Sequence, residues 1–167
     1  MQGFLTKFIS VTVLSLTFVT ATAMATQHES EKLDIVETVL SNPSFTTLVT
    51  AIKAAGLVDP LKGKGPFTVF APTNAAFVKL SAGTLGDLLD IESIEELTAV
   101  LNYHVVAGKL MAVDILKLNK ATTLQGNDIV IDTSDGFKIN NANVIQMDTM
   151  TSNGVIHVID TVMFPVK

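Results

Sequence analysis

The chain of 167 residues has no cysteine, no tryptophan and no arginine, and Tyr103 is its only tyrosine. The lack of cysteine excludes thiol nucleophiles, thiolate metal ligands and disulfides, so the packed core must stabilise the fold by itself. The lack of arginine excludes bidentate phosphate clamps. Because the formal net charge is also −5, the chain offers no basic stripe for nucleic acid, and we expect no nucleic-acid partner.

The first 25 residues have the pattern of a secretory signal peptide. Lys7 supplies a positive charge, residues 8–19 form an apolar run, and Ala23-Met24-Ala25 fits the small-residue cleavage rule. Ala21-Thr22-Ala23 is a second candidate cleavage site. The apolar run is shorter than the ~20 residues that a membrane-spanning helix needs. We therefore expect cleavage after Ala25 and no stable membrane span in the mature chain.

Residues 26–32 are polar and predict a short leader, whereas residues 33–167 have the length and apolar content of a single domain. We find no internal repeat, linker or low-complexity segment that would indicate a second domain. Because a cleaved signal peptide directs a protein out of the cytoplasm, we expect the mature chain to be secreted or periplasmic.

Helical patterns dominate the first half of the chain. Apolar residues recur at helical spacing over residues 33–40 and 45–52 and predict two helices, with Ser44 as the expected N-cap of the second. Asp59-Pro60 and residues 63–66 predict a loop. Farther on, Ser93 and Glu96 predict a capping box at the start of another helix.

Strand patterns dominate the second half. Polar and apolar residues alternate over residues 128–133, and Ser134-Asp135-Gly136 predicts a hairpin turn. Further strands are predicted at residues 143–147 and 155–162. Because the helices and strands are segregated along the chain, the sequence predicts an α+β fold and not alternating βαβ units.

Three segments of the chain resemble the conserved segments of fasciclin domains. Thr68–Phe77 resembles the first, Leu101–Val106 the central Tyr-His motif, and Ser152–Asp160 with Phe164-Pro165 the second. Their order and spacing also match, and the similarity covers Leu33–Val166. The resemblance implies a wedge-shaped β-sandwich with several helices packed beside it.

The same resemblance implies a role in adhesion. We expect a module that contacts a cell surface, a matrix polymer, or an extracellular protein or glycan. In animal members, an Asp-Ile pair ahead of the second conserved segment has been linked to receptor binding. The matching positions here are Asp148 and Thr149; the Asp is retained and the Ile is not, which weakens the case for integrin-like recognition.

Tyr103 and His104 match the Tyr-His motif, to which both adhesive and structural roles have been given in the family. They follow a predicted helix and precede the apolar Val105-Val106, a place where a buried Tyr or His finds hydrogen-bond partners. We expect a structural role and keep the adhesive role as the alternative. Tyr103 and His104 thus join Asp148 and Thr149 as candidate binding residues. The matching positions that we expect to be structural are Thr68, Pro72, Asn74, Asn153, Gly154 and His157.

Catalysis is the function that the sequence supports least. His157 lies near Ser152 and Asp160, but residues three apart on a strand point to opposite faces, so Asp160 cannot orient His157. The acidic residues between 87 and 96 lack calcium-loop spacing, and Gly63-Lys64-Gly65 is too short for a phosphate loop. We expect no catalytic residue, metal or cofactor, and a hydrolase remains only an alternative.

Two further points stay open. A small-ligand carrier or sensor of the cell envelope is the other alternative to adhesion. The oligomeric state is also open, although a weak dimer would suit an adhesive role because clustering raises effective concentration. Met147, Met150 and Met163 are expected to fill the core.

Overall fold

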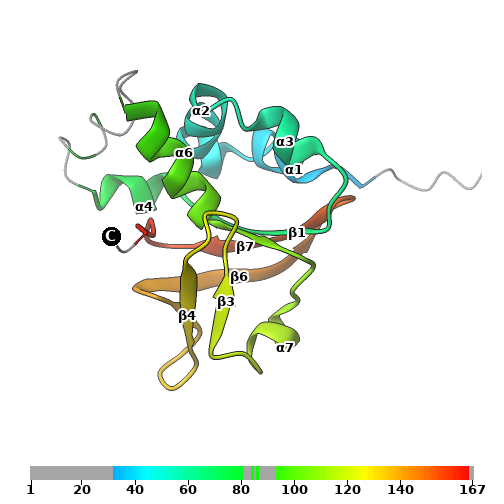
Figure 1. Cartoon of the computed structure of the whole chain (residues 1–167), viewed down its shortest axis with the longest axis vertical. Coiled ribbons are helices and arrows are strands. Elements are labelled where there is room, and N and C mark those ends of the chain that lie inside the picture. The colour runs from blue at the N-terminus through cyan, green and yellow to red at the C-terminus, as the bar shows by residue number, and fades with distance from the viewer. Residues whose placement is uncertain (1–31, 81–83, 85, 87–92, 166–167) are drawn as a thin grey trace, which may run out of the picture.

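The computed structural model describes residues 32–80, 84, 86 and 93–165. Helices make up most of the first part of the described chain and strands most of the second (Figure 1). The helices are α1 (Ile35–Leu40), the 3-10 helix η1 (Pro43–Phe45), α2 (Thr46–Ala54), α3 (Val58–Lys62), α4 (Asn74–Val78), α6 (Ile94–Tyr103) and α7 (Ala112–Ile115). The strands are β1 (Phe67–Pro72), β2 (Val105–Ala107), β3 (Lys120–Thr122), β4 (Asp128–Asp132), β5 (Lys138–Ile139), β6 (Ala142–Met150) and β7 (Gly154–Ile159). The predicted α+β class is confirmed.

The seven strands form one sheet in the order β2-β1-β7-β6-β5-β4-β3. The β1–β7 pair is parallel, and the other neighbouring pairs are antiparallel. The two ends of this order meet, because Val106 in β2 forms a bridge with Thr123. Nearby, Leu124 donates its N–H to the Val105 carbonyl at 2.8 Å. The sheet therefore folds back on itself, as a wedge-shaped sandwich requires.

Two apolar clusters lie on opposite faces of β1 and β7. Val69 and Ile156 belong to the cluster shared with α1, α2, α4 and α6. Phe70 and Ile159 belong to the cluster enclosed by the folded sheet. In Figure 1 these helices lie on one side of β1 and β7, and β3 and β4 lie on the other. Every residue of β7 is buried because both faces of the strand are covered.

The capping of the helices differs from the prediction in two places. Asp34 begins α1 with a capping box, in which its carboxylate accepts the Glu37 N–H at 2.7 Å and Glu37 accepts the Asp34 N–H at 3.3 Å. The capping box predicted at Ser93 and Glu96 is wrong, because the Ser93 side chain makes no capping bond to α6. Ser44 is not an N-cap either, since it lies inside η1.

Asn74 supplies the cap that α2 lacks in its own sequence. Its Oδ1 accepts the Thr47 N–H at 3.0 Å and the Thr46 hydroxyl at 3.1 Å. Its Nδ2 donates to the Pro43 carbonyl at 2.9 Å. Because these N–H groups would otherwise lack a partner at the helix start, Asn74 joins the start of α4 to the start of α2. The local sequence could not indicate this, because the cap comes from a distant residue.

The loop predicted around Asp59-Pro60 is partly wrong. Both residues lie in the first turn of α3, where proline is tolerated because its missing N–H has no helical partner. The predicted turn at Gly63–Pro66 does follow, and it leads directly into β1.

Gly154 permits the closest approach between the first and last strands of the domain. A Cβ at this position would lie 2.0 Å from the Phe67 carbonyl oxygen and 2.8 Å from Cδ1 of Ile35. We therefore expect Gly154→Ala to lower the free energy of unfolding by about 3 kcal/mol, because the parallel pair would have to separate. Urea unfolding of the variant measures this. Gly86→Ala is the matched control, since a Cβ there meets nothing within 4 Å, and equal losses in both variants would contradict the prediction.

Candidate functional site

Tyr103 lies at the end of α6 and is completely buried. Its hydroxyl donates to the Asp128 carbonyl at 3.2 Å and accepts from Nδ2 of Asn140 at 2.9 Å. Asn140 has a positive φ of 52°, and its Oδ1 accepts the Val130 N–H at 2.8 Å. Tyr103 therefore ties α6 to β4 and to the turn after β5.

His104 is buried beside Tyr103 and has both ring nitrogens engaged. Its Nδ1 lies 2.7 Å from the Val100 carbonyl, and its Nε2 lies 3.1 Å from the Met163 N–H. Because an amide N–H can only donate, Nε2 must accept, and the ring is neutral with its proton on Nδ1. Burial lowers the pKa of His104 to about 4, although the bond to Val100 opposes this shift. His104 thus holds the segment after β7 against α6.

These contacts decide how Tyr103 and His104 can take part in binding. Each side chain satisfies its polar atoms inside the protein, and their exposed fractions are 0% and 2%. A partner in solution cannot touch either side chain in this conformation. The contacts support the structural role expected from the sequence.

His157 connects three segments from the middle of β7. Its Nε2 lies 2.9 Å from the Leu110 carbonyl, and its Nδ1 accepts the Asp148 N–H at 3.3 Å. Its ring stacks on Phe70 with centroids 5.6 Å apart. Burial lowers the pKa of His157, while the bond to Leu110 and the charge of Asp148 oppose the shift.

Asp160 has partners other than His157. Its carboxylate accepts from the Asn143 N–H at 2.9 Å and from Nζ of Lys79 at 3.0 Å. Desolvation acts to raise the pKa of Asp160, but hydrogen bonds from Asn143, Lys79 and Thr161 outweigh it and lower the pKa. Asp160 therefore does not orient His157, in agreement with the strand geometry.

Thr68 and Pro72 lie in β1. The buried hydroxyl of Thr68 donates to the Gly108 carbonyl at 2.7 Å and accepts the Leu110 N–H at 2.9 Å. Pro72 ends the strand opposite Ile159. Thr68 and His157 thus hold the two sides of the same Leu110 peptide segment.

Asp148 and Thr149 lie in an irregular part of β6. The pairing of β6 with β7 shifts register between Gln146 and Thr149, and Asp148 has a positive φ of 56°. The Asp148 Oδ1 accepts the Ala112 N–H at 2.8 Å, at the start of α7. The Thr149 hydroxyl accepts from Nε2 of Gln146 at 3.0 Å. Both side chains are half-buried, and Asp148 has a capping contact that the sequence did not indicate.

The surface around this pair is apolar. Ile145, Met147 and Met150 have exposed fractions of 58%, 44% and 36%. The prediction that Met147 and Met150 fill the core is therefore wrong, whereas Met163 is fully buried. Strand β5 pairs only with Ala142 and Asn143, so β6 from Ile145 onward has no paired strand on that side among the described residues.

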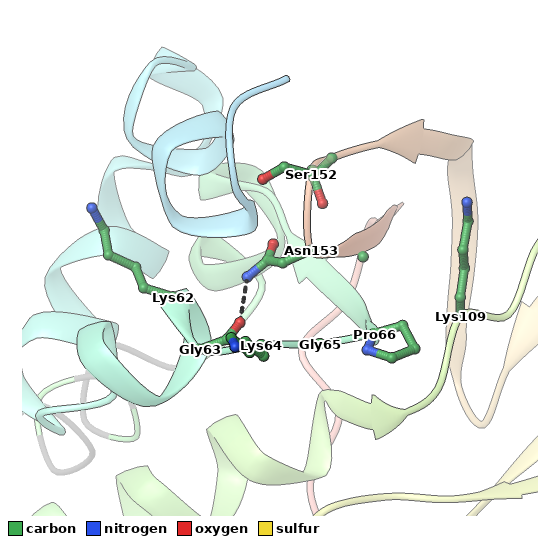
Figure 2. A pocket seen from close by; sticks show the side chains of 10 residues that line it. Lys62, Gly63, Lys64, Gly65, Pro66, Lys109, Ser152 and Asn153 are labelled. Atoms are coloured by element: carbon green, nitrogen blue, oxygen red, sulfur yellow. Dashed lines mark hydrogen bonds between the residues drawn. The ribbon is translucent and has the colours of Figure 1, made fainter. Parts of the chain in front are cut away.

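Asn153 anchors the turn between β6 and β7. Its Oδ1 accepts the Ile35 N–H at 2.9 Å, at the start of α1. Its Nδ2 donates to the Leu61 carbonyl at 2.8 Å and to the Gly63 carbonyl at 3.2 Å, at the end of α3. One amide side chain therefore fixes two helices and the turn. Figure 2 shows its bond to the Gly63 carbonyl.

A pocket of about 510 Å³ opens between this turn and the segment before β1. Its lining residues are Lys62, Gly63, Lys64, Gly65, Pro66, Lys109, Thr151, Ser152, Asn153 and Gly154. Figure 2 shows Lys62 and Lys109 on opposite sides of Asn153. The sequence alone does not indicate this site, because its lysines are far apart in the chain and Gly63-Lys64-Gly65 predicts only a turn.

Metal-ligand clusters are absent from the described part of the chain, where no three His, Cys, Asp or Glu side chains gather. The acidic residues at 87–92 lie outside the described residues. Likewise, no helix in the described ranges is long and apolar enough to cross a membrane.

Comparison with models of known protein families shows to which family the chain belongs. The family model for the fasciclin domain matches residues 43–165. The chain belongs to the fasciclin domain family. The resemblance inferred from three sequence segments is confirmed.

Relatives of this fasciclin-domain chain include two proteins of Synechocystis. The protein sll1735 is 48% identical over 130 residues, which cover 78% of this chain and 96% of that protein. The protein sll1483 is 41% identical over 167 residues, which cover 99% of this chain and 92% of that protein.

More distant similarities reach mycobacteria and insects. The cell surface glycolipoprotein MPB83 of Mycobacterium bovis is 40% identical over 131 residues, covering 75% of this chain and 57% of that protein. The fold is similar to a FAS1 domain pair from the insect cell adhesion molecule fasciclin I, with a TM-score of 0.73 and 19% identity. That similarity covers 81% of this chain and 52% of the insect chain, and it shows the fold alone.

The buried neutral His104 predicts that this fasciclin domain loses stability on mild acidification. Its pKa is lowered from 6.5 to about 4 in the folded state, so the unfolded chain binds a proton first and stability falls as the pH drops below 6.5. Between pH 7 and pH 5, we expect a loss of about 2 kcal/mol in the free energy of unfolding. Urea unfolding at both pH values measures it.

His104→Gln provides the comparison for this loss. The variant is expected to be less stable at pH 7 but to show a smaller change between pH 7 and pH 5, because one neutral buried imidazole is gone. An NMR titration of wild-type His104 checks the assignment independently. A His104 resonance that titrates near pH 6.5 would contradict the prediction.

Proposed function

We propose that this chain is an exported adhesion module that binds a cell surface, a matrix polymer, or an extracellular protein or glycan. The observation that supports this most strongly is the fasciclin-domain match over residues 43–165. Two similar proteins are described as a cell surface glycolipoprotein and an insect cell adhesion molecule. The folded domain uses its histidines and Asp160 for structural contacts, which leaves the surface as the place for function.

Export rests on the signal peptide proposed at residues 1–25, which lie outside the described residues together with most of the 26–32 leader. Cleavage after Ala25 gives a mature chain that begins at Thr26 and ends at Lys167. N-terminal sequencing of the protein recovered outside the cytoplasm is expected to start at Thr26. A start at Met24 would indicate the second cleavage site, and retention of Met1 would contradict export by cleavage.

We place the adhesive contact at the β6 surface around Asp148 and Thr149. Ile145, Met147 and Met150, which flank the pair along β6, expose apolar area, which suits a protein partner. Asp148 uses Oδ1 to cap α7, and no hydrogen bond within the described residues uses its Oδ2. The carboxylate therefore still has an oxygen and a charge to offer a partner.

A carrier of an apolar ligand has less support. The described apolar cavity between α1, α2 and α3 is lined by Val36, Val39, Ile52 and their neighbours and has a volume of about 30 Å³. Drug-sized ligands occupy pockets of roughly 300–1,000 Å³. This cavity is therefore too small for an apolar ligand, and the β6 surface remains the preferred site.

Attachment of cells to a coated surface tests the adhesion proposal. The exported protein is coated beside an inert protein of similar charge, and cells of the organism that produces it are counted. We expect saturable attachment that falls with Asp148→Asn, because this variant loses the charge but keeps the Oδ1 acceptor and tolerates the positive φ. Its free energy of unfolding should change by less than about 1 kcal/mol.

Two further variants make the result interpretable. Asp148→Ala also removes the cap and leaves a residue that disfavours positive φ, so it should cost about 2 kcal/mol of stability. Asp135→Asn removes an exposed charge on the β4–β5 turn and should leave attachment unchanged. If cells attach to the Asp148→Asn variant as well as to the wild-type protein, Asp148 has a structural role only. If cells attach to neither protein, the adhesion proposal itself is wrong.

A further inference from the structure

The pocket beside Asn153 concentrates positive charge on an acidic protein. Lys62, Lys64 and Lys109 line it, although the whole chain has a formal net charge of −5. Lys62 is partly neutralised, since its Nζ lies 3.5 Å from Glu37 and 3.9 Å from Asp34. Within the described residues, Lys64 and Lys109 take part in no ion pair. Two lysines without an ion-pair partner among these residues therefore line one opening.

The wall of this pocket also holds an unused hydroxyl group. Thr151 lines the pocket and has an exposed fraction of 6%. Its Oγ1 is buried and has no hydrogen-bond partner, although buried polar atoms nearly always have one. The neighbouring Ser152 is exposed and makes no side-chain hydrogen bond among the described contacts. The lining of the pocket thus combines two hydroxyl groups with two lysines that have no ion-pair partner in the described part of the chain.

Neighbouring polar groups are already occupied by the fold. Asn153 uses both ends of its amide to hold α1 and α3, and the Thr151 N–H is bonded to the Gly154 carbonyl. The side-chain groups of the pocket that remain are two hydroxyls, which can donate, and two ammonium groups, a combination that matches an anion.

We propose that this pocket binds an oxyanion group, a phosphate or a sulfate. Lys64 and Lys109 supply charge from two sides, and the hydroxyls of Thr151 and Ser152 donate hydrogen bonds. The volume of about 510 Å³ exceeds that of a free ion, so the pocket also has room for a sugar that carries the group as an ester. The site shares no lining residue with the β6 surface, which it adjoins at Thr151, and it does not depend on the adhesion proposal.

Titration of the exported protein with sodium phosphate and with sodium sulfate tests the site, at constant ionic strength in chloride buffer. NMR of the backbone amides is expected to show saturable shifts at residues 63–65 and 151–153. Lys64→Gln and Lys109→Gln should each weaken binding about tenfold. Lys117→Gln is the matched control, because Lys117 is exposed and lies outside the pocket.

Thr151→Val separates a ligand contact from a structural role. The hydroxyl has no partner in the free protein, so its loss should weaken phosphate binding without lowering the midpoint of urea unfolding. A loss of stability with unchanged binding would contradict the assignment of Thr151 to the ligand.

The binding of glucose 6-phosphate and of glucose is measured to distinguish a phosphate carried by a sugar from the free ion. Tighter binding of glucose 6-phosphate than of inorganic phosphate indicates a sugar-borne group, whereas equal binding indicates the free ion, and either result supports an oxyanion site. Glucose alone should not bind. The proposal is overturned if neither anion saturates, or if Lys117→Gln weakens binding as much as the pocket variants do.

Discussion

The parallel pairing of β1 with β7 is the constraint on which the rest of the structure depends. It places Phe67 directly opposite Gly154 and so joins the beginning of the sheet to the end of the domain. Helices pack on one face of this pair, and the folded-back strands cover the other. Since both faces are buried, the pair can be reached only along its ends, which is where the turn at Asn153 and the lysine pocket lie.

Hydrogen bonds from polar side chains link distant segments of this chain, as disulfides do in many exported domains. Asn74 joins two helices, Asn153 joins two helices to a turn, and His104 joins α6 to the segment after β7. The His104 bond is buried, and the bonds of Asn74 and Asn153 are part-buried; a buried bond is costly to leave with one partner alone. In this chain, the residues that match the motifs of the family therefore mainly hold distant segments together.

The sequence was sufficient for the fold class and for most elements, because these depend on local periodicity and on motifs with a fixed order. The sequence did not predict the contacts between residues that are far apart in the chain. Asn74 caps a helix that begins at Thr46, and Asp148 caps one that begins at Ala112; neither pairing leaves a local signal. The sequence does not indicate the pocket for the same reason, since Lys64 and Lys109 line the same pocket only after β1 and β2 have paired.

The sheet order has a consequence for the chain while it is being made. β1 emerges early, but its parallel partner β7 is the last strand to be synthesised. Until that strand is available, one whole side of β1 lacks its hydrogen-bond partners and both apolar clusters lack a wall. Pairing between distant segments forms slowly in any case. A growing chain of this topology therefore cannot complete its sheet or its two cores until β7 has been made, and such a delay would suit the export proposed above.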